Sequence, residues 1–258
     1  MKYLVSVIMP VFNARNFVVD AIDSILNQTY AELELIIVDD ASVDGTIDLI
    51  SDRYKDEKRI VIEKNEVNQG PAISRNRGIS LACGRFVAFC DSDDLWHSDK
   101  LSVQMAVMQQ SSAAICYSDY DVIDHAGIVI GQRRAVKDTL KYTDMLYANR
   151  VGNLTCVIDV HQTGKPYQPE CNHEDLACLL SLMRAGHLAC HAPGVLASYR
   201  IHENNISRGK WRSAYWHYKV LHHREGLGMV AAFYYTIAGR FGLVIEEFML
   251  PKVPGHKR

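Results

Sequence analysis

LELIIVDD, residues 33–40, is a short run of mostly apolar and β-branched side chains that ends in two carboxylates. Runs of the same kind occur at residues 4–9, LVSVIM, and at residues 85–91, RFVAFCD. Strands that are apolar on both faces are typical of a parallel sheet covered by helices. Between the runs, apolar residues at helical spacing predict helices over residues 15–26, 44–54 and 71–82. This alternation predicts an α/β fold with a mostly parallel central sheet and helices on both faces.

The chain beyond residue 110 is less regular. Residues 113–120, AAICYSDY, and residues 127–132, GIVIGQ, alternate only weakly, and residues 174–185 have the apolar spacing of a helix. No internal repeat and no low-complexity linker is present. A chain of 258 residues with 48% hydrophobic residues can bury a full core, as one large α/β domain or as a domain with a small appendage.

Charge and cysteine usage exclude some partners and compartments. The formal net charge of −2 provides no basic field for a polyanion, so we expect no nucleic acid partner. The seven cysteines are scattered without a C-x-x-C pair and are expected to be buried thiols in a reducing cytosol. The N-terminal run is interrupted by Pro10 and lacks the long apolar region of a signal peptide, so we expect it to be the first strand.

Each of the three strong runs is followed by a polar cluster. These clusters are residues 10–13, residues 39–42 and residues 91–94. In parallel sheets, ligands bind beyond the carboxyl ends of the strands, where loops converge. Carboxylates crowded at that edge repel one another, so a divalent cation or a proton is expected to relieve the repulsion. Asp91 and Asp93 form a D-x-D pair suited to a hard cation that also takes phosphate oxygens, although a solvated turn before the next helix would show the same pattern.

Two further segments carry groups that bind nucleotides. Asp39 and Asp40 end the second strand, where a carboxylate can accept hydrogen bonds from a base or a ribose; a helix cap is the alternative. Residues 68–78, NQGPAISRNRG, place Arg75 and several amides on a helix after a glycine turn, within reach of phosphates. An amphipathic helix with exposed arginines explains the same segment.

Taken together, three segments resemble the inverting family 2 glycosyltransferases of the GT-A fold in order and spacing. They are SVIMPVFNA (6–14), IIVDDASVDGT (36–46) and NQGPAISRNRGISLACGRFVAFCDSDDLW (68–96). The resemblance implies a donor site that binds a nucleoside diphosphate sugar, with UDP favoured, and Mn²⁺ or Mg²⁺ as cofactor. It assigns the nucleoside to Pro10, Asp39 and Asp40, the diphosphate region to Arg75, the D-x-D motif to Asp91, Ser92 and Asp93, and the direct metal contact to Asp93.

The same resemblance extends to two later segments. An E-D pair, Glu174 and Asp175, begins a predicted helix, and Asp175 is implied to be the catalytic base that removes a proton from the attacking sugar hydroxyl. Residues 199–207, YRIHENNIS, resemble the family's Y-R-x-H segment, so His202 is expected to complete the metal shell with Asp91 and Asp93, or to touch phosphate. The E-D helix lacks the tryptophan that family members often carry, so the resemblance assigns no acceptor contacts there. No Q-x-x-R-W motif and no multiple membrane spans, both typical of processive synthases, are present, so we expect transfer of one sugar per encounter.

The resemblance also divides the chain. Residues 1–207 are expected to form the GT-A domain, with a nucleotide-sugar half at 1–110 and an acceptor half at 111–207. Residues 208–258 form a helical extension that is basic and aromatic at its start. Such an extension is similar to those of bacterial enzymes that build O-antigen, capsule or lipooligosaccharide on a lipid carrier. We therefore expect a glycan or glycolipid acceptor and a cytoplasmic enzyme, peripheral at the inner membrane face; a helical pair packed on the core is the alternative.

Sequence motifs distinguish this chain from three other classes of α/β protein. A nucleotidyltransferase would show a glycine-rich basic loop after the first strand, whereas this chain has Pro10-Val-Phe-Asn13. A dinucleotide oxidoreductase would show G-x-G-x-x-G at the same place. A nucleotide-sugar-binding protein without turnover keeps the donor fold, and the presence of Asp93 and Asp175 argues against it.

Overall fold

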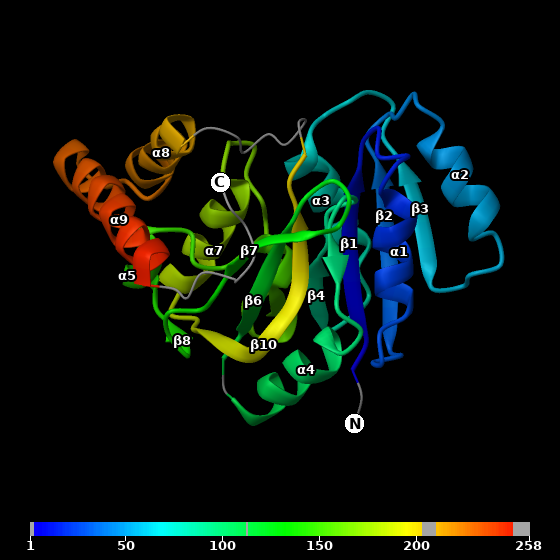
Figure 1. Ribbon diagram of the computed structural model, residues 1–258, viewed down its shortest axis with the longest axis horizontal. Coiled ribbons are helices and arrows are strands. Elements are labelled where there is room, and N and C mark those ends of the chain that lie inside the picture. The colour runs from blue at the N-terminus through cyan, green and yellow to red at the C-terminus, as the bar shows by residue number, and fades with distance from the viewer. Residues whose placement is uncertain (1–2, 112, 203–209, 250–258) are drawn as a thin grey trace.

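The computed structural model describes residues 3–111, 113–202 and 210–249, with side chains up to residue 241. Within these residues the strands form one sheet, in the order β3-β2-β1-β4-β9-β6-β10-β5, with β7 beside β6 and β8 beside β10 (Figure 1). The strands are β1 (Val5–Val11), β2 (Leu33–Asp39), β3 (Ile60–Lys64), β4 (Phe86–Phe89), β5 (Leu95–Trp96), β6 (Ile115–Ile123), β7 (Val129–Arg133), β8 (Thr139–Leu140), β9 (Val157–Asp159) and β10 (Ala189–Arg200).

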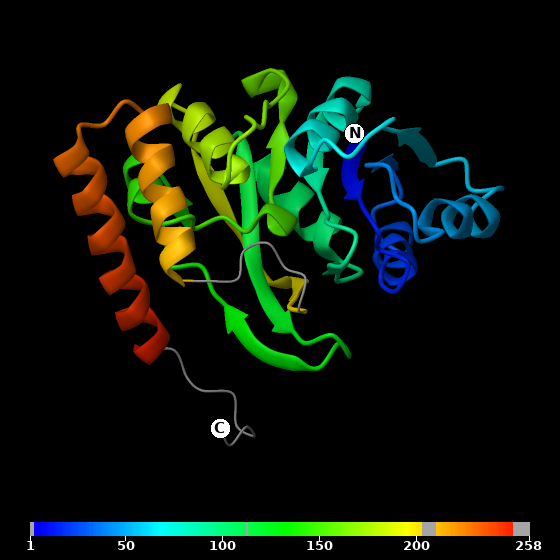
Figure 2. The same cartoon turned by 90° about the horizontal axis from the view of Figure 1, so that it is seen from above.

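Helices cover both faces of this sheet, and a helical pair extends it at one end. They are α1 (Val18–Leu26), α2 (Thr46–Arg53), α3 (Pro71–Leu81), α4 (Lys100–Gln110), α5 (Tyr142–Tyr147), α6 (Val160–Thr163), α7 (Glu174–Arg184), α8 (Lys210–Lys219) and α9 (Met229–Met249), with a 3₁₀ turn η1 (Asn153–Thr155) and a π-helical turn η2 (Val220–Arg224). Figures 1 and 2 show α8 and α9 side by side, at the end of the molecule opposite α2 and β3.

The two-residue period of the strands explains the two layers. Val7 and Met9 of β1 face one core with α1, α2 and α4, while Ile8 faces a second core with α3, α5 and α7. Successive side chains of a strand point to opposite faces, so a strand that is apolar throughout is buried on both. The predicted α/β fold is confirmed.

The sheet is less parallel in its second half than we expected. β3, β2, β1 and β4 run parallel, as do β6 and β10. However, β9 is antiparallel to both β4 and β6, and β5, β7 and β8 also pair antiparallel. These strands are short or lie in the weakly alternating region, where the sequence carries little information about direction. One sheet nevertheless contains strands from both predicted halves of the chain, from β1 to β10.

The C-terminal helices pack on the core along one side. Ala232 of α9 and Leu221 of η2 are fully buried, and His217 of α8 hydrogen-bonds the Leu146 carbonyl through its Nε2 at 3.0 Å. A Cβ at Gly239 would overlap the carbonyl oxygen of Tyr147, so only glycine permits this approach of α9 to α5.

The predicted boundary at 207/208 lies outside the described residues. Among the residues described, no helix combines the length and apolar character needed to cross a membrane.

Candidate active site

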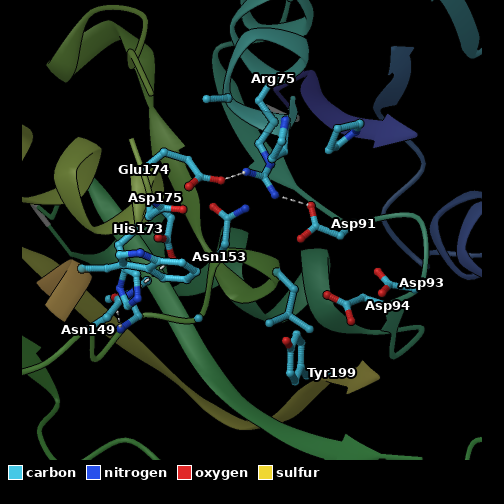
Figure 3. Close-up of a pocket in the computed structure, with 18 of the residues that line it drawn as sticks. Arg75, Asp91, Asp93, Asp94, Asn149, Asn153, His173, Glu174, Asp175 and Tyr199 are labelled. Atoms are coloured by element: carbon cyan, nitrogen blue, oxygen red, sulfur yellow. Dashed lines mark hydrogen bonds and ion pairs between the residues drawn. The ribbon is translucent and has the colours of Figure 1, made fainter. Parts of the chain in front are cut away.

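A cleft of about 1810 Å³ lies beyond the carboxyl ends of β1, β2 and β4. Figure 3 shows Asp91, Asp93 and Asp94 on one side of it and His173, Asp175 and Asn149 on the other. Every predicted site residue except Asp39 lines the cleft: Pro10, Asp40, Arg75, Asp91, Ser92, Asp93, Asp175 and His202. The fold therefore brings together residues that are up to 192 positions apart in the chain, from Pro10 to His202.

The loops that follow β1 and β2 are hydrogen-bonded to each other. Asn13 adopts a positive φ of 49°, a conformation that asparagine tolerates better than most residues. Its N–H donates to Ser42 Oγ at 2.9 Å, and its Oδ1 accepts from the Val43 N–H at 2.9 Å. These contacts hold the loops after β1 and β2 in one arrangement at the mouth of the cleft.

Asp39 and Asp40 have different surroundings. Asp40 is buried, and its carboxylate accepts from Asn65 Nδ2 (2.8 Å) and from the backbone N–H groups of Gln69 (2.9 Å) and Gly70 (2.7 Å), so it fixes the loop before α3. Asp39 is also buried, but its Oδ1 has no hydrogen-bond partner among the described residues. A buried carboxylate oxygen in that state costs free energy unless a ligand supplies a donor.

Arg75 connects the two acidic sides of the cleft. Its guanidinium bonds Asp91 Oδ1 at 2.6 Å and Glu174 Oε1 at 2.8 Å, and it reaches Gln168 Oε1 at 3.2 Å. Burial alone would lower the pKa of Arg75, but the charges of Asp91 and Glu174 outweigh it and raise the pKa. We expected a divalent cation or a proton to relieve the repulsion between carboxylates at the strand ends; at Asp91 the positive charge of Arg75 contributes to this relief, and it also pairs with Glu174.

Asp93 is paired with His202, not with Arg75. Its Oδ2 lies 2.8 Å from His202 Nε2, and the His202 ring stacks on Phe17 with centroids 5.2 Å apart. Burial and the charge of Asp91 raise the pKa of Asp93, while the hydrogen bond from His202 opposes the rise. A carboxylate in this setting gains from a nearby cation, and His202 is close enough to share it.

Asp94 was not predicted as a site residue, and it holds the D-x-D turn in place. It is 1% exposed, and its Oδ1 accepts from the Arg200 N–H at 3.0 Å. Arg200 Nε in turn donates to the Asp93 carbonyl at 2.8 Å. The acidic turn is thereby fixed against the end of β10, a contact between segments more than 100 residues apart.

The two acids of the E-D pair have separate environments. Glu174 points to Arg75, and burial raises its pKa against the opposing charge of that arginine. Asp175 instead accepts a hydrogen bond from Asn149 Nδ2 at its Oδ2, at 2.7 Å. Glu174 is therefore held in an ion pair, whereas Asp175 contacts an uncharged amide.

Several lining residues escaped the sequence prediction. Asn149 and Asn153 belong to none of the site motifs, and Asn153 Nδ2 is buried without a partner among the described residues. His173 precedes the E-D pair in the left-handed region, with φ 61°, and meets Trp216 edge-on with centroids 5.8 Å apart. Only the proximity of His173 to the E-D pair was visible in the sequence; the asparagines reach the cleft through the tertiary fold.

Comparison with known proteins agrees with this geometry. Residues 6–163 match Glycosyl transferase family 2. The putative teichuronic acid biosynthesis glycosyltransferase TuaG of Bacillus subtilis is 40% identical over 214 residues, which cover 83% of this chain and 85% of that protein. The UDP-Glc:alpha-D-GlcNAc-diphosphoundecaprenol beta-1,3-glucosyltransferase WfgD of Escherichia coli is 34% identical over 215 residues, covering 81% of this chain and 82% of that protein.

A solved structure supports the fold. The mannosyltransferase PcManGT of Pyrobaculum calidifontis, in complex with GDP-Man and Mn²⁺, superposes with a TM-score of 0.68 at 16% identity, covering 97% of this chain and 77% of that one. At this identity the likeness concerns the fold alone, and it agrees with the predicted GT-A arrangement. The chain is therefore a glycosyltransferase and belongs to glycosyl transferase family 2.

Proposed function

We propose that this enzyme transfers one sugar, with inversion, from a nucleoside diphosphate sugar to a hydroxyl of a lipid-linked glycan in bacterial surface polysaccharide synthesis. The observation that carries the proposal is the placement of Asp93 and Asp175 on opposite sides of one cleft, with Glu174 removed from competition by Arg75. The names of TuaG and WfgD support the pathway and the lipid-linked acceptor, and the WfgD name favours UDP in the donor.

A divalent metal fits the residues at the D-x-D turn. Among the described residues there is no group of three or more His, Cys, Asp and Glu that could enclose a metal ion. Mg²⁺ and similar cations commonly use one or two protein carboxylates together with substrate phosphates and water. Asp93 and His202, 2.8 Å apart, would supply such a partial shell, whereas Asp91 is shared with Arg75. When bound, Mn²⁺ or Mg²⁺ would offset negative charge on the departing diphosphate.

The protein's own side chains perform the remaining tasks. Asp175, oriented by Asn149, accepts the proton of the attacking hydroxyl. Pro10 lines the cleft. Asp39 is buried outside the cleft lining, and its Oδ1 has no partner among the described residues; we propose that it accepts an N–H from the nucleobase. Holding donor and acceptor in line makes the displacement effectively unimolecular. A single displacement opposite the leaving group inverts the anomeric carbon.

A thermal-shift experiment tests the donor site. UDP-, GDP- and dTDP-sugars are each added at the same concentration, with and without Mn²⁺. A donor present at about 100 times its dissociation constant stabilises the folded state by about 2.7 kcal/mol, which raises Tm by about 5–10 °C. We expect this rise with UDP-sugars and only in the presence of Mn²⁺. Asp93→Ala is expected to abolish the metal-dependent part.

The control is Asp56→Ala, which removes an exposed carboxylate outside the cleft and should leave the shift intact. If Asp93→Ala keeps the Mn²⁺-dependent rise, the metal assignment is wrong. If no nucleotide sugar raises Tm with or without metal, the proposed donor chemistry fails.

We further propose that the enzyme is cytoplasmic and rests on the inner face of the membrane through α9. Met229, Val230, Phe233 and Tyr234 are exposed, at positions i, i+1, i+4 and i+5 of that helix, with Val230 85% and Phe233 61% exposed. Residues at this spacing share one face of a helix. Exposed basic residues Arg212, Lys219 and Arg224 of the neighbouring segment suit an anionic lipid surface.

Vesicle flotation tests this contact. The wild-type chain is expected to float with vesicles containing anionic lipid, and the double variant Val230→Asp, Phe233→Asp should reduce the bound fraction about tenfold or more, because two large apolar side chains no longer enter the interface. The matched control is Val43→Asp, which changes an 88% exposed valine in the β2–α2 loop. Flotation that survives the double variant would rule out the α9 face as the membrane contact.

A further inference from the structure

The cleft continues beyond Asp175 to a second end formed by the C-terminal helices. Trp211 and Trp216 of α8 and Arg240 and Phe241 of α9 line it; we call this the α9 end. The donor motifs follow β1, β2 and β4, and these strands lie toward the other end of the molecule from α8 and α9 (Figures 1 and 2). Nothing assigned to the donor sugar therefore accounts for the α9 end.

Arg240 is the unusual group at this end. It is a partly buried cation in a helix that is otherwise apolar around it. Among the described residues, no hydrogen bond or ion pair engages its guanidinium, and burial lowers its pKa without a neighbouring carboxylate to oppose the change. A partly desolvated cation of this kind is costly unless an anion joins it. Arginine also matches phosphate oxygens in a bidentate geometry.

Arg240, His173 and Asp175 line the same cleft. Burial lowers the pKa of His173, the charge of Asp175 opposes that change, and the charge of Arg240 adds to it. His173 thus lies within electrostatic reach of both residues. An acceptor sugar whose hydroxyl meets Asp175 would have its own anionic linkage on the Arg240 side, beside the indole of Trp216 that contacts His173.

We propose that Arg240 binds the diphosphate that joins the acceptor sugar to its lipid, so that the α9 end is a second diphosphate subsite, separate from that of the donor. The inference rests on the proposed function, since it assumes a lipid-linked acceptor. The exposed face of α9 formed by Met229, Val230 and Phe233 continues along the same helix and offers an apolar path for the hydrocarbon chain.

The test compares two synthetic acceptors in neutral detergent without a bilayer: the acceptor sugar linked to a long alkyl chain through a diphosphate, and the same sugar linked directly as an alkyl ether. The wild-type enzyme is expected to prefer the diphosphate acceptor in kcat/KM by about 10–100-fold, the range of one or two charge-assisted hydrogen bonds. Arg240→Gln should remove most of this preference, Arg240→Lys should keep part of it, and the donor KM should stay unchanged in both.

Arg184→Gln is the matched control, because it removes an exposed arginine that pairs with Glu225 in the same region and does not line the cleft. The proposal is overturned if Arg240→Gln slows both acceptors equally, if it raises the donor KM, which would assign Arg240 to the donor diphosphate, or if the variant matches wild type in detergent and loses activity only on anionic vesicles, which would assign it to lipid headgroups.

A binding measurement separates this inference from the proposed function. The alkyl diphosphate itself is titrated into each protein while tryptophan fluorescence is followed, since Trp211 and Trp216 lie at the α9 end. Binding by wild type that is weakened at least tenfold in Arg240→Gln supports the subsite even if neither acceptor is glycosylated, in which case the proposed transfer alone fails. Equal binding by both proteins overturns the subsite.

Discussion

Replacing Asp175 with asparagine is expected to lower kcat by about 10²–10⁴-fold, the range for loss of a positioned general base. Asparagine keeps the size and the hydrogen-bonding oxygen of the side chain but cannot take the hydroxyl proton. Donor binding should remain close to wild type, because Asp175 lies across the cleft from Asp93 (Figure 3). The measurement is steady-state transfer to a lipid-linked acceptor, together with the donor-induced rise in Tm.

Asp48→Asn provides the control, since Asp48 is likewise an acid in the first turn of a helix but is exposed outside the cleft. Asn149→Ala should produce a smaller loss, about tenfold in kcat with little change in the donor KM, because it frees the Asp175 carboxylate without removing it. Turnover within a few-fold of wild type in Asp175→Asn, with donor still bound, would show that another group is the base.

Replacing Arg75 with methionine is expected to lower the free energy of unfolding by about 3 kcal/mol. The Arg75 side chain is 7% exposed, and its removal leaves Asp91 and Glu174 without their shared counter-charge. We place the effect at the lower end for buried ion pairs, because the Asp91 side chain is 34% exposed and partly solvated. Chemical denaturation measures it, and the same variant should bind donor more weakly because the D-x-D turn loses its support.

Arg53→Met is the matched control: it also breaks an arginine–aspartate pair, to Asp23 at 3.1 Å, but both side chains are exposed. It should change stability far less than Arg75→Met. Adding Glu174→Gln to Arg75→Met should recover part of the lost stability, because one uncompensated carboxylate is removed and the two sites are coupled. If Arg75→Met is as stable as Arg53→Met, the ion-pair cluster does not organise the cleft.

The sequence predicted most strands and helices of residues 1–110 correctly, because each of them is marked by a pattern within a short segment. Strands such as β2 are apolar on both faces, and the helices between them have clear caps or breaks: Gly70 takes a positive φ of 88°, and Pro71 occupies the first turn of α3. The direction of the later strands was not predictable, because β5, β8 and β9 contain only two or three residues. Their pairing is decided by neighbours in the sheet.

The site shows the same division. The polar clusters at the strand ends and the resemblance to a family named eight residues that line the cleft, whereas Asp39 does not line it and other lining residues, such as Asn149 and Asn153, were missed. The hydrogen-bond partners of each side chain could not be read from the sequence. Asp40 binds backbone N–H groups of the loop before α3, Glu174 is paired with an arginine 99 positions away, and Asp175 accepts a hydrogen bond from Asn149. Whether a carboxylate is paired depends on distances of a few ångströms that no spacing rule contains.

The sequence by itself determined the fold class, the family and the identities of the acids at the cleft, because hydrophobic period and strand-end motifs are properties of short segments. Only the tertiary structure decided which carboxylates pair with Arg75, that Asn149 hydrogen-bonds Asp175, and that Arg240 reaches the cleft from a helix more than 60 positions beyond Asp175. The reason is physical: charge, burial and hydrogen bonding act through space, over ranges far shorter than the molecule, between residues that the chain itself keeps far apart.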